Sequence, residues 1–298
     1  GATLRQGRVD LAIMLDPAGT TLEGTFNGTG LRRGPLSLAR FAANAELRGG
    51  LGQVRLAIAG SRGRSFDLQS VVEVPPDSYR IVAQGTVDRR PLRLDAPAVV
   101  TRDGDGWRLA SATIAFAGGT ATVGGRFTTD SNMIDATLSQ MPLAVLDIVS
   151  PGLGLGGTAS GKISYASTTG SAPTGRIDMA VSGLTRSGLL VSSNPIGMAV
   201  AGVLTADRAG IRAVVGSGGR TIGRGQALLR LAPGDITTRF ANAGVFGQLR
   251  YEGPADTLWR LTRVELFDLS GPVAIAAAVT GTLADPAIRG SVPARGAR

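Results

Sequence analysis

Apolar and polar residues alternate along nearly the whole of this 298-residue chain. Near the N-terminus, Val9, Leu11 and Ile13 alternate with Arg8 and Asp10. The same period of two returns at residues 54–58, 177–181 and 273–279. Successive side chains of a β-strand point to opposite faces of its sheet, so this period predicts strands with one apolar and one polar face. Repeated over the chain, it predicts a very long sheet with one apolar face.

Turn-forming residues separate the alternating stretches. Clusters of Pro, Gly and Asp occur at residues 75–77, 103–106 and 216–219, as in antiparallel hairpins. One strand with its turn takes about 12 to 16 residues, so we expect roughly 18 to 22 strands in an all-β fold. The scarcity of helix signals argues against parallel βαβ units and favours a mostly antiparallel sheet. Residues 35–48 fit either a strand or a short helix.

The alternation is lost between residues 139 and 151. Leu143, Leu146 and Val149 recur at intervals of three, and Pro142 suits the first position of a helix. We predict a short amphipathic helix of about ten residues, which is marginal alone and would cap or plug a β core. This divides the chain into three predicted parts: a β-groove segment at 1–138, a helix with a Gly-rich return to the sheet at 139–157, and a second β-groove segment at 158–298.

Chemically versatile side chains are scarce. The chain has no His and no Cys, which removes the commonest general base, the thiolate nucleophile and the usual transition-metal ligands. Residues 152–157 match G-x-G-x-x-G, but the expected helix precedes them and a strand follows, the reverse of a dinucleotide site. Residues 156–163 approach a phosphate-binding loop, but Ile163 stands where Ser or Thr would bind magnesium. Asp103 and Asp105 fit a turn better than a calcium site. Since none of these motifs holds, we predict no enzyme activity, no metal and no cofactor.

The net charge of +9 comes almost wholly from Arg. These arginines are scattered among acidic residues, and only 4% of the residues are aromatic, so we expect no nucleic-acid partner. No apolar run is long enough to span a bilayer as a helix, and the N-terminus lacks the pattern of a signal peptide. Because the alternation reaches both ends, we expect a segment of a longer protein.

The apolar face is the strongest functional signal. Small residues in the apolar phase, at Gly24, Ala83, Gly85 and Ala136, are expected to leave room, as in a concave, curved sheet that holds flexible hydrocarbon. An open sheet of this kind would expose more apolar area than soluble proteins tolerate, so something must cover it. The candidate lining residues of this groove are Val9, Leu11, Ile13, Val54, Leu56, Ile58, Ile81, Ile177, Met179, Val181, Val200, Val273, Ile275 and Val279.

Three stretches, together about a third of the chain, carry a family resemblance. Residues 268–292 read DLSGPVAIAAAVTGTLADPAIRGSV, a strand followed by Gly-Thr-Leu, an Asp-Pro pair and another strand. Residues 139–165 place a short helix before a Gly-rich return to the sheet, and residues 253–271 read GPADTLWRLTRVELFDLSG. In these elements and their order the chain resembles the AsmA-like family, and within it the TamB group.

The resemblance implies a long sheet curled into a taco-like or gutter-shaped groove with an apolar, lipid-sized interior. It implies a bridge in the periplasm of a Gram-negative bacterium, anchored in the inner membrane by a helix outside this chain. Such a bridge conducts phospholipid between the two membranes, with the acyl chains as the bound partner. It also supports outer-membrane protein and autotransporter assembly through an assembly-factor barrel of the TamA or BamA type, bound by a region outside this chain. The alternative is a β-rich surface passenger or adhesin domain with a closed core.

Overall fold

The computed structural model confirms an all-β protein. Strands account for 76% of the residues and helices for 4%, and one large antiparallel sheet contains 20 strands. This number lies within the range expected from the spacing of the turns. The structure describes residues 1–15, 20–186, 195–232, 236–255 and 271–291. The chain forms two compact units, the first made of residues 1–129 and 138–153 and the second of residues 130–137 and 154–298. The three-part division at 139–157 stays a prediction.

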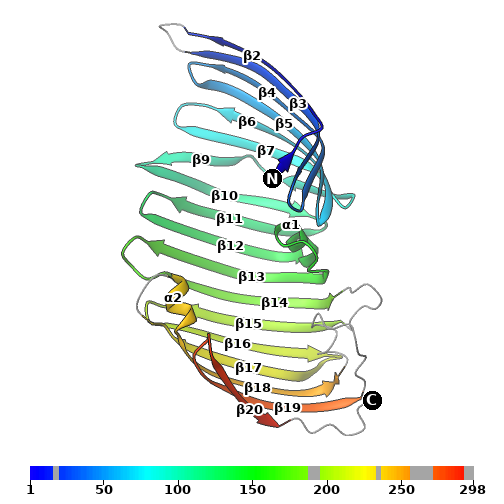
Figure 1. The fold of residues 1–298 in the computed structure, drawn as a ribbon, viewed down its shortest axis with the longest axis vertical. Helices are drawn as coiled ribbons and strands as arrows, with labels where there is room; N and C mark the ends of the chain where they lie inside the picture. Colours follow the sequence, from blue (N-terminus) through cyan, green and yellow to red (C-terminus); the bar gives the residue numbers. More distant parts are fainter. Residues whose placement is uncertain (16–19, 187–194, 233–235, 256–270, 292–298) are drawn as a thin grey trace. The chain divides into compact units, whose positions relative to one another are not determined.

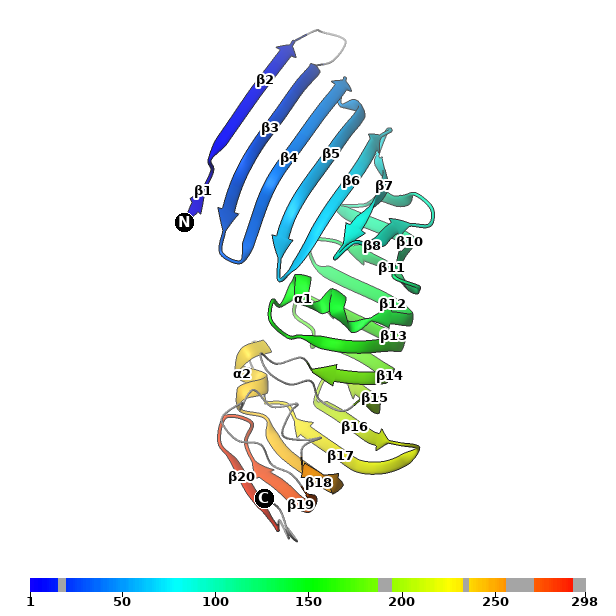
Figure 2. The same ribbon diagram turned by 90° about the vertical axis from the view of Figure 1, so that its right-hand side faces the viewer.

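The first unit contains an antiparallel meander of long strands. Strands β2 to β7 each pair with the next, β1 pairs with β3, and both β8 and β9 lie between β7 and β10, which pairs with β11. In Figure 2, β2 to β6 lie side by side. The strands of this unit are β1 (Ala2–Thr3), β2 (Gln6–Met14), β3 (Thr21–Arg33), β4 (Leu36–Arg48), β5 (Leu51–Arg62), β6 (Arg64–Val74), β7 (Ser78–Val87), β8 (Arg90–Leu94), β9 (Ala98–Asp103), β10 (Gly106–Phe116) and β11 (Gly119–Phe127).

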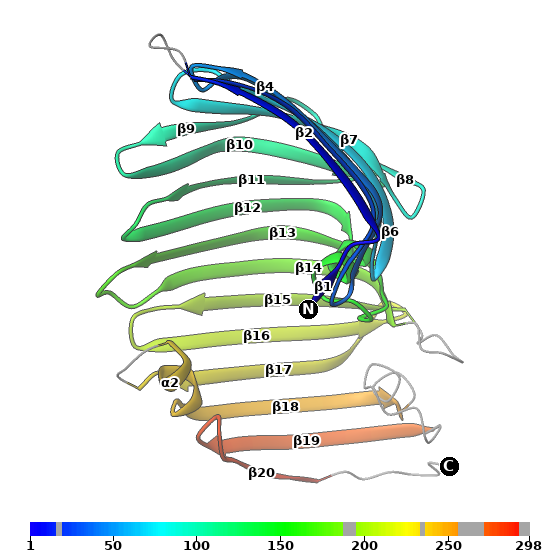
Figure 3. The same cartoon turned by 45° about the horizontal axis from the view of Figure 1, so that its top comes forward.

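The second unit continues the same construction. Each strand from β13 to β20 pairs antiparallel with the next (Figures 1 and 3). The strands are β13 (Leu155–Thr168), β14 (Thr174–Arg186), β15 (Ile196–Leu204), β16 (Arg208–Ser217), β17 (Arg220–Arg230), β18 (Gly244–Pro254), β19 (Pro272–Gly281) and β20 (Pro286–Ser291). Strand β12 (Ser131–Pro142) contributes residues to both units.

The register of the first unit separates its apolar and polar residues. Residues that are partners across neighbouring strands share a face, so a chain of partners can be followed across the sheet. One such row from β2 to β7 consists of Leu11, Gly24, Ala45, Val54, Val72 and Ile81. The adjacent row, on the opposite face, consists of Ala12, Glu23, Glu46, Gln53, Glu73 and Arg80. We call these the apolar face and the polar face of the first unit.

The second unit shows the same separation over more strands. An apolar row from β13 to β20 consists of Gly161, Met179, Val200, Ala213, Gly225, Leu249, Ala277 and Gly290. Its neighbour on the polar face consists of Lys162, Asp178, Ala201, Arg212, Gln226, Gln248, Ala278 and Arg289. Two rows of the polar face depart from the pattern, because the exposed members include Val203, Leu228 and Phe246 in one row and Val214 in another.

The predicted helix after residue 142 exists but is shorter than expected. A 3₁₀ turn over Leu143–Val145 leads into the helix α1 (Leu146–Val149). The side chains of Val145 and Ile148 pack against the core of the first unit, whereas Leu146 is 39% exposed. The expectation that Leu146 lies on the packing face of the helix was therefore wrong. The two residues that pack, Val145 and Ile148, are also three positions apart, so the spacing of the predicted stripe holds but its position along the chain is shifted.

The core under α1 lies on the apolar face. Its buried members are Val87, Phe116, Ala121 and Met141, and Phe66 and Leu92 pack against them. Phe66 is the partner of Val87, and Phe116 is the partner of Leu92. Phe66 also has the same parity as Val72 in β6, so it belongs to the apolar face. The helix therefore covers one end of that face, in agreement with the capping role expected from the sequence.

Two further elements refine the sequence expectations. The ambiguous residues 35–48 contain a strand, β4. Alternate residues of this strand, such as Phe41, Ala43 and Ala45, lie on the apolar face. A second helix, α2 (Ile236–Ala241), lies between β17 and β18 and had no clear sequence signal. The residues that follow α2 tie it to the β19–β20 turn, since the backbone N–H groups of Leu283 and Ala284 donate to the carbonyls of Ala243 and Ala241 at 3.0 Å.

Candidate functional site

The candidate lining residues gather on one face in each unit. In the first unit they all lie on the apolar face: Val9, Leu11, Ile13, Val54, Leu56, Ile58 and Ile81. In the second unit the other set does the same: Ile177, Met179, Val181, Val200, Val273, Ile275 and Val279. That these residues contact lipid stays a prediction.

Much of this apolar surface is exposed. In β2, Val9 is 63% exposed and Leu11 53% exposed, and in the second unit Ile211 is 46% and Leu249 44% exposed. The candidate lining residues of the second unit are less exposed: Val181 is only 9% exposed, and the other six are half-buried. Monomeric soluble proteins rarely leave contiguous apolar patches of more than a few hundred Å² uncovered. These faces therefore present apolar side chains to the surface along successive strands.

Glycines on the apolar face of the first unit do not leave the expected open space. A Cβ at Gly24 would lie 2.7 Å from Cδ1 of Leu11, and one at Gly28 would lie 2.1 Å from the ring of Phe41. The Phe41 ring also packs on Phe26, with 5.0 Å between the centroids. At Gly85 the backbone has a φ of +156°, and a Cβ would meet the carbonyl oxygen of Asp67 at 2.1 Å. The expectation of room at Gly24 and Gly85 is therefore wrong, because neighbouring side chains or backbone fill it.

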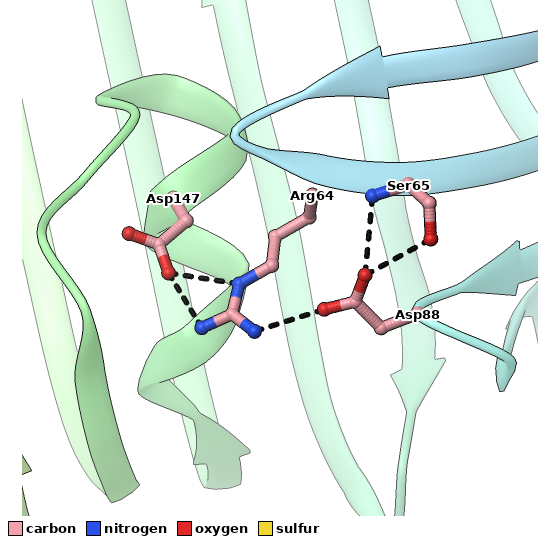
Figure 4. Close-up of polar contacts among 4 residues, drawn as sticks. All are labelled: Arg64, Ser65, Asp88 and Asp147. Atoms are coloured by element: carbon pink, nitrogen blue, oxygen red, sulfur yellow. Dashed lines mark hydrogen bonds and ion pairs between the residues drawn. The ribbon is translucent and has the colours of Figure 1, made fainter. Parts of the chain in front are cut away.

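A partly buried ion-pair network holds α1 on the apolar face (Figure 4). The guanidinium of Arg64 donates from Nε to Asp147 Oδ2 at 2.8 Å and lies 2.7 Å from the same oxygen through Nη2. Its Nη1 donates to Asp88 at 2.9 Å, and Asp88 also accepts hydrogen bonds from the backbone N–H and the hydroxyl of Ser65. The Asp147 side chain is only 5% exposed. The network joins α1 to the β5–β6 and β7–β8 turns, and sequence spacing gave no sign of it.

The electrostatics of this network follow from its contacts. The hydrogen bond to Asp147 raises the pKa of Arg64, against the opposing effect of burial. Burial alone would raise the pKa of Asp88, but the hydrogen bonds from Arg64 and Ser65 outweigh it and lower that pKa. Both shifts favour the charged forms, so the network is a structural element rather than a proton donor or acceptor for chemistry.

Acid should weaken the network through Asp88. Because the pKa of Asp88 is lower in the folded protein than its ordinary value of 3.8, its contribution to stability is present above pH 3.8 and is lost as the pH falls below that value. Asp88→Asn should lower the urea midpoint at pH 7 and make the midpoint fall less steeply between pH 4 and pH 2.5. Urea unfolding of both proteins across this range measures the effect. An unchanged slope in the variant would show that Asp88 is not a source of the acid sensitivity.

Other candidate sites are weak in the described part of the chain. Residues 104 and 105 form the turn between β9 and β10, as expected, and Asp103 accepts hydrogen bonds from Arg108 and Arg126 at 3.0 and 3.1 Å. Among the described residues, no group of three or more His, Cys, Asp or Glu side chains could hold a metal ion. Within the same ranges, no helix has both the length and the apolar character needed to cross a membrane.

No protein-family model matches the chain, and comparisons with curated proteins and with solved structures give no match.

Proposed function

We propose that this protein binds the acyl chains of phospholipids on its apolar sheet faces and conducts them along the sheet. The observation that carries this proposal is the apolar row of the second unit, which crosses eight strands from Gly161 to Gly290 without a polar side chain. The shorter row of the first unit, from Leu11 to Ile81, supports it.

Such a surface suits a mobile hydrocarbon ligand. Burial of each methylene group is favourable by about 0.8 kcal/mol and needs no directional contact. Neighbouring strands are about 4.8 Å apart, so each step along the sheet offers an acyl chain a similar apolar environment. A ligand held by many equivalent contacts can slide from strand to strand, because no single contact has to break before the next one forms. Catalysis, a metal or a cofactor has no part in this function.

The cellular setting of the proposal rests on the family resemblance. As a member of the AsmA-like family of the TamB type, the protein would act in the periplasm of a Gram-negative bacterium. There it would carry phospholipid between the inner and outer membranes and support outer-membrane protein assembly. The inner-membrane anchor and the surface that binds an assembly barrel of the TamA or BamA type would lie outside this chain.

Mass spectrometry of lipids bound to the gently purified protein tests the proposal. We expect phospholipids to co-purify at a fixed ratio after expression in a Gram-negative host and extensive washing. A protein that carries no phospholipid above the level of an unrelated soluble control would contradict lipid conduction. That result would favour the alternative of a surface passenger or adhesin domain, which needs no lipid.

A further inference from the structure

Four arginines on the polar face of the second unit have no carboxylate partner among the described residues, whereas two on the polar face of the first unit do. On the polar face of the first unit, Arg80 lies 3.9 Å from Glu73, and Arg48 lies 3.8 Å from Glu23. On the polar face of the second unit, no hydrogen bond or ion pair joins four arginines to any described residue: Arg212, Arg224, Arg250 and Arg289. This face therefore presents uncompensated positive charge.

Two of these arginines are direct partners across neighbouring strands. Arg224 in β17 lies opposite Arg250 in β18, and both side chains are exposed. Directly opposite residues have Cβ atoms about 4.5–5.5 Å apart, and like charges in this position destabilise a sheet. Their outer neighbours in the same row are Val214 and Ala276, which carry no charge. An anion held between the two guanidinium groups would remove the repulsion.

A hollow in the surface adjoins this pair. It has a volume of about 330 Å³ and is lined by residues of β17, β18, β19 and the end of β20. Its lining includes six residues of the polar face and five further residues, among them the apolar-face residues Gly223, Tyr251 and Ile275. The six of the polar face are Arg224, Arg250, Glu252, Ala274, Ala276 and Ser291, and the other two are Thr221 and Ile222. The two alanines leave space beside the arginines, and the Ser291 hydroxyl adds a hydrogen-bond donor. Glu252 is the one carboxylate in this group, so the lining still has a net positive charge.

We propose that Arg224 and Arg250 together bind the phosphate group of an anionic ligand in this hollow. Guanidinium groups donate pairs of N–H bonds in a geometry that matches phosphate oxygens, and such charge-assisted hydrogen bonds are among the strongest in proteins. The phosphate oxygens accept from both arginines, and the alanine surface accommodates the substituent on the phosphate. The two arginines project from the polar face, whereas acyl chains would bind on the apolar face.

Titration with glycerol 3-phosphate at low salt, followed by calorimetry or ³¹P resonance, tests the site. We expect Arg224→Gln and Arg250→Gln each to weaken binding at least about tenfold, because each removes charge-assisted hydrogen bonds to the phosphate. Glu252→Gln should strengthen binding, because it removes the one carboxylate of the lining. The matched control is Arg212→Gln, which loses the same charge from the same face but lies outside the hollow.

The outcomes distinguish a specific phosphate-binding site from nonspecific electrostatic attraction of phosphate to the basic face. Equal weakening in Arg212→Gln would overturn the proposal, since the phosphate would then respond only to the overall charge. Failure of the unaltered protein to bind either glycerol 3-phosphate or phosphatidylcholine vesicles with phosphatidic acid would also overturn it. Binding to vesicles that depends on Arg224 and Arg250 identifies a lipid headgroup as the ligand, whereas binding to the soluble ester alone identifies a free phosphate ester. The variants of the hollow and the control Arg212→Gln should all retain lipid on the apolar face. This distinguishes failure of the phosphate site from failure of lipid conduction.

Discussion

Replacing Val200 with Asp should reduce the phospholipid that co-purifies with this protein by about a hundredfold, since a charged side chain among acyl chains costs about 2.5–3.5 kcal/mol. Val200 is the third of the eight residues in the apolar row of the second unit, between Met179 and Ala213. A carboxylate there would have to lose its hydration whenever a lipid tail lies across β15. The interruption would block movement in both directions along the row.

The control for this change lies one residue away on the same strand. Ala199 points to the polar face, where its partners are Ala180 and Val214. Ala199→Asp introduces the same charge at an exposed position, so it should leave lipid binding near the level of the unaltered protein. Without bound lipid the apolar face is open to water, so both variants should keep the strand content of the parent by circular dichroism. Equal lipid loss in the two variants would contradict a role for the apolar face.

Alternation with a period of two was enough to predict most of the fold. It holds in β2, β5, β14 and β19, where one face is apolar and the other solvated, and a slip of one residue would exchange the two faces. For that reason the candidate lining residues, chosen by parity alone, all reach the apolar faces. The same logic was ambiguous at residues 35–48, because Phe41 and its neighbours allow two periods. Pairing with β3 and β5 on both sides decides for the strand β4.

Contacts between residues far apart in the sequence, and a short helix of weak intrinsic propensity, could not be predicted from the alternation. The helix α2 contains two Thr residues, which are weak helix formers, and its anchoring to the β19–β20 turn arises only in the folded unit. Arg64 and Asp147 are 83 residues apart in sequence, and no periodic pattern relates them. The opposed pair Arg224 and Arg250 depends on the register between β17 and β18, which is set by the fold and not by spacing alone.

Removing the Arg64 side chain should destabilise the first unit by about 3 kcal/mol, the low end of the cost of breaking a buried ion pair. Arg64→Ala leaves the Asp147 carboxylate, which is 5% exposed, without its guanidinium partner. The low end applies because Arg64 itself is 31% exposed and water can reach part of the site. Loss of the pair should also release α1 from the core around Phe116. Urea unfolding followed by the fluorescence of Trp107, in a Trp259→Phe background, reports on this unit.

Arg40→Ala provides the matched comparison, because Arg40 forms an ion pair of similar length with Asp67 at 2.6 Å in the same unit. The side chains of Arg40 and Asp67 are 69% and 46% exposed, and exposed ion pairs of this kind contribute at most about 1 kcal/mol to stability. Arg64→Ala should therefore lower the urea midpoint clearly more than Arg40→Ala does. Similar midpoints for the two variants would show that α1 is held by the packing of Val145 and Ile148 alone. The double change Arg64→Ala with Asp147→Leu should recover stability, because it removes the buried charge that the single change deprives of the Arg64 guanidinium.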